Sequence, residues 1–289
     1  MQHSLGNKKE YAKAFRRTFF TSLARGEVKS NHLDFIKMHF PVDNRVSLRD
    51  FFCSAFDELR KSYRNEYIYK SFITNKIVLG RYSPLTSSIS FELAVNKSIV
   101  DIAVFNKEST AYEIKTEFDT PRRLLTQTPD YVKAFDKVYV VTHPKFSKRY
   151  CDMVLPNVGV MVLTEKDTLQ TVKEAISNSD QRDLRFIFNM MRKGEYVAIV
   201  ESYLNKKLDV PNGLISGYCR EVFFNMPKDI AYKLFLKAMQ ARTTTQENAD
   251  FIYSLPASLR VLGYSTPLSK KQREYIMDII DDKGFLNVV

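Results

Sequence analysis

Three charged side chains lie within strand-like sequence and could act together on one substrate. Glu113 and Lys115 are two residues apart in "YEIK", and Asp101 interrupts the apolar run "SIVDIAVF". Because side chains alternate between the two faces of a strand, Glu113 and Lys115 share one face. A buried carboxylate without a partner is costly, so Asp101 requires a partner or a metal ion.

The loop between the two strands decides whether Asp101 joins the other two residues. A three-residue loop at Asn106–Glu108 places Asp101 opposite Glu113, whereas a loop at Lys107–Ser109 places it opposite Lys115. Either odd-length loop brings the three charges to one face, and a two- or four-residue loop separates them. We therefore expect an odd-length hairpin loop.

Two chemical interpretations of these charges stay open at this point. Two carboxylates about 4 Å apart repel by about 4 kcal/mol at an effective dielectric constant of about 20. Lys115 offsets part of this repulsion, and a divalent cation such as Mg²⁺ offsets more, because it prefers carboxylate, water and phosphate oxygens. The alternative is a partly buried ion network of Asp101, Glu113 and Lys115 without a function.

The elements around these residues predict a mixed α/β core. A helix is expected to end at Gly80, and three strands follow in "SISFELAV", "SIVDIAVF" and "TAYEIKT". A helix from Pro121, the strand "KVYVVTH", a helix near residues 145–153 and the strand "VGVMVLT" complete the order. The last two strands lack polar alternation, as strands covered on both faces do.

The remaining sequence reads as helical on both sides of this core. In the N-terminal part, apolar residues recur at four-residue steps, Gly26 is expected to end a helix, and Ser47 is expected to be an N-cap. That apolar series consists of Tyr11, Phe15, Phe19 and Leu23. We expect an N-terminal basic helical region at 1–60, the α/β core at 61–165 and a C-terminal helical region at 166–289.

Composition favours a polyanionic partner. The chain has 289 residues with 44 Lys and Arg against 33 Asp and Glu, which gives a net charge of +11. Such a charge favours nucleic acid over an acidic membrane surface. Three widely spaced cysteines and an N-terminus without an apolar core indicate neither a disulfide framework nor a signal peptide. We expect a soluble cytoplasmic protein with DNA as its partner and no membrane; a second copy of the chain or a defence-system protein is a further partner left open.

The core region resembles the PD-(D/E)XK nuclease superfamily, which has the restriction-endonuclease-like fold. The resemblance covers about residues 61–165 and rests on the Asp, YEIK, Asp-Thr, Arg-Leu, Gln and Tyr pattern of a bacterial family of uncharacterised PD-(D/E)XK-like proteins. It is carried by "VDIAVF", "YEIKTEFDTPRRLLTQ" and "YVKAFDKVYVV".

The resemblance implies a role for each residue of the pattern. Asp101 and Glu113 would hold Mg²⁺ or Mn²⁺ with the backbone carbonyl of Ile114, and Lys115 would activate water and stabilise the developing charge. Glu66 is the preferred further metal ligand and Glu92 its rival.

Two further residues match an element of RecB-like members of the superfamily. Gln127 is expected to be a fourth catalytic residue, and Tyr131 is expected to contact nucleic acid. Both share a helix face, but Pro129 between them predicts either a kink or a helix that restarts with Thr128 as its N-cap.

The residues "DTPRR" are typical of the start of a helix. Thr120 is a suitable N-cap, Pro121 a suitable first helical residue, and Asp119 complements the helix dipole. Arg122 and Arg123 then occupy the first turn, where the dipole disfavours cations. They are expected either to contact nucleic-acid phosphate or to pair with Glu117 or Asp119.

The function expected from these residues and from the resemblance is metal-dependent hydrolysis of DNA phosphodiester bonds, in restriction or defence against phages. The alternatives are a non-catalytic nucleic-acid-binding or regulatory module on a nuclease-like core, and a protein–protein adaptor that uses the C-terminal helices.

Overall fold

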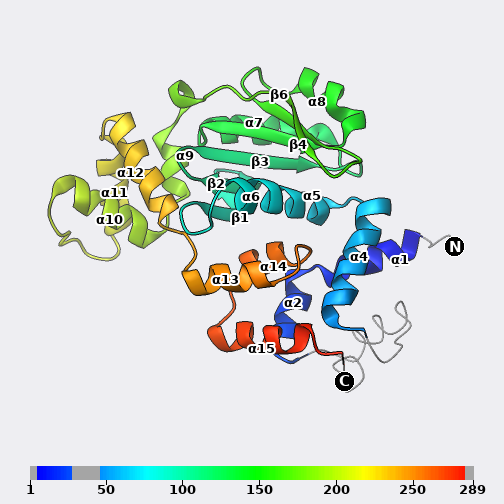
Figure 1. Cartoon of the computed structure of the whole chain (residues 1–289). Helices are drawn as coiled ribbons and strands as arrows, with labels where there is room; N and C mark the ends of the chain where they lie inside the picture. Colours follow the sequence, from blue (N-terminus) through cyan, green and yellow to red (C-terminus); the bar gives the residue numbers. More distant parts are fainter. Residues whose placement is uncertain (1–4, 28–45, 284–289) are drawn as a thin grey trace. The chain divides into compact units, whose positions relative to one another are not determined.

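The chain forms two compact units. A computed structural model describes residues 5–27 and 46–283 (Figure 1). The first unit combines Met1–Asn75 with Thr245–Val289, and the second unit is Lys76–Thr244. The helices expected at 166–289 are therefore distributed over both units.

The first unit is helical. Its helices are α1 (Leu5–Ala14), α2 (Arg17–Ala24), α4 (Leu48–Ser62), α5 (Glu66–Ile73), α13 (Gln246–Ser254), α14 (Arg260–Ser265) and α15 (Lys270–Ile280). The expected apolar series at Tyr11, Phe15, Phe19 and Leu23 is buried. The helix that carries it nevertheless breaks after Ala14, so α1 and α2 are separate helices.

Capping and ion pairs stabilise this helical unit. Ser47 is the N-cap of α4 and forms a capping box with Asp50, which confirms the expected helix start. Gly26 follows α2 with a φ of 69°, a left-handed conformation that glycine adopts without strain. Arg49 of α4 pairs with Asp281, 2.6 Å away, and so joins the N-terminal helices to the end of α15.

The second unit is built on a six-stranded mixed sheet. Its strands are β1 (Ser88–Val95), β2 (Ser98–Phe105), β3 (Ser109–Lys115), β4 (Lys137–Thr142), β5 (Gly159–Leu163) and β6 (Leu169–Lys173). They lie side by side in sequence order. Strands β1 to β3 form an antiparallel meander, β4 and β5 continue parallel to β3, and β6 is antiparallel to β5.

Helices flank this sheet. The segment before β1 contains the π-helical turn η1 (Thr74–Val78) and α6 (Leu79–Arg81), and η2 (Pro121–Arg123) leads into α7 (Leu124–Val132). Further along are η3 (Pro144–Phe146), α8 (Ser147–Met153), η4 (Ser179–Gln181), α9 (Leu184–Asn189), α10 (Lys193–Leu204), α11 (Ile215–Phe224) and α12 (Lys228–Gln240). Figure 1 shows α7 behind the strands, and α10, α11 and α12 grouped beside one end of the sheet.

The core of the second unit lies between one face of the sheet and these helices. Phe105 of β2 contacts Phe135 and Phe235 with ring centroids 5.9 and 6.0 Å apart. The helix–meander–helix–strand–helix–strand order expected from the sequence is confirmed, and so is a mixed α/β fold. Strand β6 was not expected, because "LQTVK" is mostly exposed and lacks an apolar pattern. No helix among the described residues is long and apolar enough to cross a membrane.

A buried polar cluster closes the end of the sheet where β3 and β4 begin. The Asp136 carboxylate accepts hydrogen bonds from the Ser109 backbone N–H at 2.7 Å and from the Tyr232 hydroxyl. It also pairs with the Arg182 guanidinium. Asp136 and Tyr232 are 5% and 7% exposed, so little water can replace these partners. One carboxylate therefore joins two strand starts, the segment before α9, and α12.

Replacing Asp136 by asparagine should destabilise the protein strongly. Loss of one partner from a buried ion pair costs about 3–5 kcal/mol, here because Arg182 would keep a largely buried charge. Urea unfolding should show this decrease. The matched change Asp152→Asn removes an exposed pair with Lys148 and should alter the unfolding free energy by less than about 1 kcal/mol; equal effects of the two changes would contradict this interpretation.

Candidate active site

The register of the β2–β3 hairpin brings Asp101 to Glu113. Paired residues run from Ile102 with Tyr112 to Phe105 with Ser109, which leaves a three-residue loop at Asn106–Glu108. Continued by one residue, this register puts Asp101 opposite Glu113. The first of the two hairpin alternatives is therefore confirmed, and the three charges share one face of the sheet.

The backbone pairing of β2 with β3 ends one position before Asp101 and Glu113. The β2–β3 pairing ends at Ile102 and Tyr112, although β2 begins at Ser98 and β3 continues to Lys115. Side chains provide hydrogen-bond partners for the backbone groups that the other strand no longer pairs. Asp101 Oδ2 accepts a hydrogen bond from the Ile114 N–H at 2.7 Å, and the Tyr131 hydroxyl lies 2.6 Å from the Ile99 carbonyl oxygen. Because a strand residue directs its N–H and C=O to the same side, the Ile114 carbonyl also faces this gap.

Glu113, Lys115, Gln127 and Tyr131 form one hydrogen-bonded network. Lys115 Nζ lies 2.5 Å from Glu113 Oε1 and 3.2 Å from Gln127 Oε1. The Tyr131 hydroxyl lies 2.8 Å from Glu113 Oε2, and Gln127 Nε2 donates to it at 3.3 Å. Both oxygens of the Glu113 carboxylate are thus engaged, and Lys115 is held between two acceptors.

Burial governs the electrostatics of this network. Glu113 and Lys115 are 2% and 7% exposed, whereas Asp101 and Gln127 are half-buried. Burial raises the pKa of Glu113 above the ordinary glutamate value, although the Lys115 ammonium and the Tyr131 hydroxyl act in the opposite direction. Burial and the Glu113 carboxylate raise the pKa of Tyr131, so its hydroxyl keeps its proton at neutral pH.

Helix α7 carries Gln127 and Tyr131 without a break. Pro129 lies inside α7, and the helix runs from Leu124 to Val132. The alternative of a restart at Thr128 is wrong, because the Thr128 hydroxyl donates to the Leu124 carbonyl one turn earlier. Gln127 and Tyr131 share a helix face as predicted. Tyr131 is fully buried, so in this structure its hydroxyl holds the Glu113 carboxylate and is not exposed to a nucleic acid.

The segment between β3 and α7 differs from the expected helix start. Thr120 precedes Pro121 in an extended conformation, but its side chain forms no capping hydrogen bond, and the first turn is the 3-10 turn η2. Asp119 instead accepts hydrogen bonds from Thr116, at 2.9 Å from its N–H and 2.7 Å from its hydroxyl. A local loop bond thus replaces the expected cap and fixes the chain directly after Lys115.

The two arginines after this loop face solvent. Arg122 and Arg123 are exposed, and neither forms an ion pair within the described ranges. Pairing with Glu117 or Asp119 is therefore absent from the described structure, and the guanidinium groups remain available to phosphate.

The two candidates for a further carboxylate lie in different parts of the chain. Glu66 belongs to the first unit and pairs there with Lys70, 2.6 Å away. Glu92 lies in β1, where the pairing of Phe91 with Ile102 and of Leu93 with Val100 leaves it opposite Asp101. Its φ of 53° is unusual for a strand residue. The role of Glu66 as a metal ligand stays a prediction, as does that of Glu92.

Three groups near the end of the β2–β3 pairing are oxygen donors of the type that a hard divalent cation binds. Asp101, Glu113 and the Ile114 carbonyl provide two carboxylates and one backbone oxygen, the ligand types that Mg²⁺ and Mn²⁺ prefer. Within residues 5–27 and 46–283, no group of three His, Cys, Asp or Glu side chains could hold a metal. A cation here would therefore depend on the Ile114 carbonyl and on water.

Sequence reasoning missed the residues that support this network. Thr142, at the end of β4, donates to the Lys115 carbonyl at 2.7 Å and fixes the backbone of the catalytic candidate. Its only sequence signal is a polar residue that ends an apolar strand. Thr116 was also missed, because its role depends on a local loop conformation.

The chain matches a family model over residues 59–251, which is well over half of its length. The family is described as bacteriophage P4 protein cII. This chain belongs to that family. The matched region contains Asp101, Glu113, Lys115, Gln127 and Tyr131, and it begins before α5.

Comparison with individual proteins gives a shorter match. Protein cII of Enterobacteria phage P4 is 38% identical over 93 residues, which are 30% of this chain and 35% of that protein. The chain therefore spans about a third of the length of this curated relative. No solved structure matches the chain. Neither match refers to a nuclease, so the resemblance to the PD-(D/E)XK superfamily stays a hypothesis.

Replacing Lys115 by methionine should reveal how strongly the buried network depends on charge balance. Glu113 would keep a buried carboxylate without its cation, and the unfolding free energy should fall by about 3–5 kcal/mol at neutral pH. The double change Glu113→Gln with Lys115→Met removes both charges and should recover most of this loss. Urea unfolding measures both; a double variant as unstable as the single one would contradict the electrostatic explanation.

Proposed function

We propose that this protein is a Mg²⁺- or Mn²⁺-dependent phosphodiesterase that acts on DNA. The observation that carries the proposal is the separation of β2 and β3 beside the Glu113–Lys115 pair. It leaves Asp101, Glu113 and the Ile114 carbonyl around one gap, with the Lys115 ammonium on the same face of the sheet. A role in restriction or phage defence is part of this proposal by analogy alone.

Each residue has a distinct role in the proposed reaction. Asp101, Glu113 and the Ile114 carbonyl would hold the cation, which when bound would acidify water and polarise the phosphate. Lys115 orients the attacking water and stabilises the charge that develops on the phosphate oxygens as the new P–O bond forms and the ester P–O bond breaks. Gln127 positions the Lys115 ammonium, and Tyr131 positions the Glu113 carboxylate.

The surface beside this site suits a nucleic-acid backbone. Arg122 and Arg123 lie exposed directly after the Thr116–Asp119 loop, and the chain as a whole carries a net charge of +11. Phe118 in the same loop is 55% exposed and Leu125 of α7 is 59% exposed. Cationic and apolar groups side by side can contact phosphates and bases respectively.

A second function is favoured by one observation. The Glu113–Lys115–Gln127–Tyr131 network is closed, since the carboxylate and the ammonium are satisfied by protein partners. A closed buried network is also what a structural ion pair in a non-catalytic nucleic-acid-binding module would show. Cleavage assays separate the two proposals.

Asp101→Asn should strongly reduce the rate of cleavage while leaving the protein folded. Asparagine can still accept the Ile114 N–H, but it removes a carboxylate from the gap, and loss of one preorganised electrostatic group lowers rates by about 100- to 1000-fold. The assay incubates wild-type protein and the variant with plasmid, single-stranded DNA and RNA in Mg²⁺ or Mn²⁺, and thermal melting checks the fold.

Asp152→Asn provides the matched control, because this exposed carboxylate lies on α8 and pairs only with Lys148 among the described residues. It should cleave at the wild-type rate. No cleavage by the wild-type protein on any substrate, together with unchanged DNA affinity in Asp101→Asn, would favour the non-catalytic module. Equal cleavage by wild type and Asp101→Asn would indicate a contaminating nuclease.

Binding of Mn²⁺ should weaken as the pH falls through the pKa of Glu113. Burial raises this pKa above 4.5, so the carboxyl group takes up a proton at a higher pH than an exposed glutamate and then competes with the cation. Electron paramagnetic resonance of free Mn²⁺ measures the affinity without any substrate. Glu113→Gln should bind more weakly and with a flatter pH profile; an identical profile in both proteins would contradict a role for Glu113 in metal binding.

A further inference from the structure

A basic pocket lies at the end of the sheet opposite the candidate active site. It is a cavity of about 440 Å³, and its lining includes Lys133, Arg182, Arg185 and Lys228 together with Asp180 and Asp183. Arg182 belongs to the Asp136 cluster beside Ser109, at the start of β3, whereas Lys115 ends that strand. Six residue-to-residue steps of extended chain place these ends about 20 Å apart, so the pocket is a separate site.

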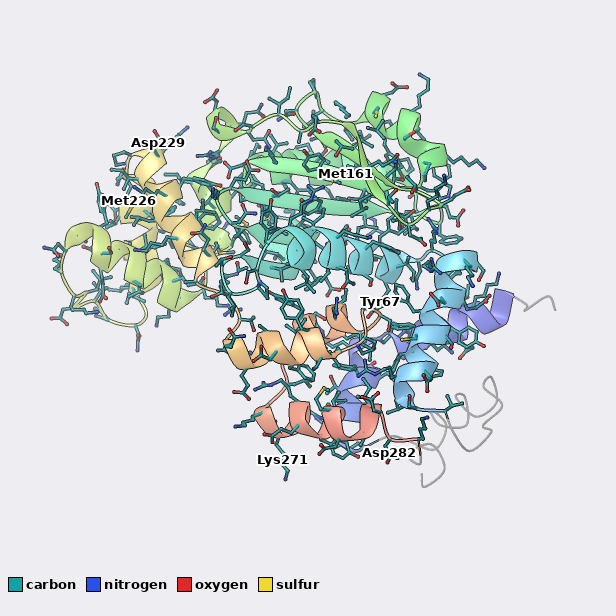
Figure 2. The ribbon with its side chains drawn as sticks, viewed as in Figure 1. Tyr67, Met161, Met226, Asp229, Lys271 and Asp282 are labelled. Atoms are coloured by element: carbon teal, nitrogen blue, oxygen red, sulfur yellow. The ribbon has the colours of Figure 1, made fainter. Side chains whose placement is uncertain are left out.

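The cationic groups come from three different elements of the second unit. Lys133 follows directly after α7, Lys228 is the first residue of α12, and Arg182 and Arg185 flank the start of α9. Figure 2 shows the start of α12 at Asp229, the residue next to Lys228, with Met226 just before it. The N-terminal end of α12 adds the positive end of its dipole to these charges.

Arg182 is held in place before any ligand arrives. Its guanidinium pairs with Asp136 and stacks on the Tyr232 ring, 3.6 Å from the ring centroid. Its Nε is buried and forms no hydrogen bond to the described residues. A planar guanidinium fixed in this way loses little conformational freedom when it binds a second anion.

The acidic residues of the lining leave the cations in excess. Asp183 is already paired with Arg185, 2.8 Å away. Arg182 is paired with Asp136, so Lys133 and Lys228 remain in the lining against the single carboxylate of Asp180. Lys228 is exposed and forms no ion pair with the described residues. A cavity of this size can hold a ligand as large as a mononucleotide.

We propose that this pocket binds the phosphate group of a nucleotide or of a nucleic-acid end. Lys133, at the end of α7, and Lys228, at the start of α12, attract the phosphate, and the fixed Arg182 guanidinium lines the pocket beside them. Phosphate is the anion expected for such a set, because guanidinium and ammonium groups bind its oxygens with charge-assisted hydrogen bonds.

The test measures binding by calorimetry to the full chain, with inorganic phosphate, adenosine monophosphate and adenosine as probes. Wild-type protein should bind the monophosphate at least about tenfold more tightly than adenosine, the factor that corresponds to one charge-assisted hydrogen bond of about 1.4 kcal/mol. The double change Lys133→Gln with Lys228→Gln should remove this difference. Both side chains are exposed, so their replacement should not unfold the protein.

Lys233→Gln with Lys237→Gln is the matched control, since both lysines are exposed on α12 and neither lines the pocket. It should retain wild-type affinity. Equal affinity for adenosine and its monophosphate would overturn the proposal, and so would equal losses in the two double variants.

A second pair of probes distinguishes the two sources of phosphate. A short oligonucleotide with a 5′-phosphate and the same oligonucleotide with a 5′-hydroxyl should bind with different affinities if the pocket recognises a nucleic-acid end. If the monophosphate binds but these two oligonucleotides bind alike, the ligand is a free nucleotide. Asp101→Asn should keep the wild-type difference between the phosphorylated probes and their unphosphorylated counterparts, so this result is independent of whether the protein cleaves DNA.

Discussion

The early end of the β2–β3 ladder is the constraint on which the candidate active site depends. Backbone groups inside a folded protein need hydrogen-bond partners, and two strands that separate leave several of them unpaired. Here the Asp101 carboxylate satisfies the Ile114 N–H, and the Tyr131 hydroxyl reaches the Ile99 carbonyl. Asp101 thereby lies next to Glu113, and Tyr131 also donates to the Glu113 carboxylate. The side chains that satisfy the separated strands are therefore the same ones that form the polar site.

A buried ion pair in this position is not explained by stability alone. Burial of a carboxylate and an ammonium costs free energy that their attraction only partly returns, and apolar residues of similar volume often stabilise a core better. Glu113 and Lys115 are nevertheless both buried, with Gln127 and Tyr131 directed at them from α7. Such an arrangement occurs both at catalytic sites and in structural ion networks.

Much of this site could be predicted from the sequence, because side chains alternate between the two faces of a strand at every residue and this alternation depends only on the local chain. Alternation placed Glu113 with Lys115, and counting the residues of the hairpin loop limited Asp101 to two positions. The break between α1 and α2, the missing Thr120 cap and strand β6 could not be predicted. Each of these depends on contacts between distant residues or on a local loop bond that competes with the usual pattern.

The Tyr131 hydroxyl has one proton and two acceptors. The Ile99 carbonyl and the Glu113 carboxylate both lie within hydrogen-bond distance, at 2.6 and 2.8 Å, but only one of them can receive that proton at a time. Neutralisation of Glu113, by protonation or by a bound cation, weakens the hydrogen bond from the Tyr131 hydroxyl to the carboxylate. The hydroxyl then donates its proton to the Ile99 carbonyl. The Tyr131 hydroxyl therefore couples the hydrogen bonding of Ile99 in β2 to the charge of the Glu113 carboxylate. A change in that charge should alter the position of β2 where it separates from β3.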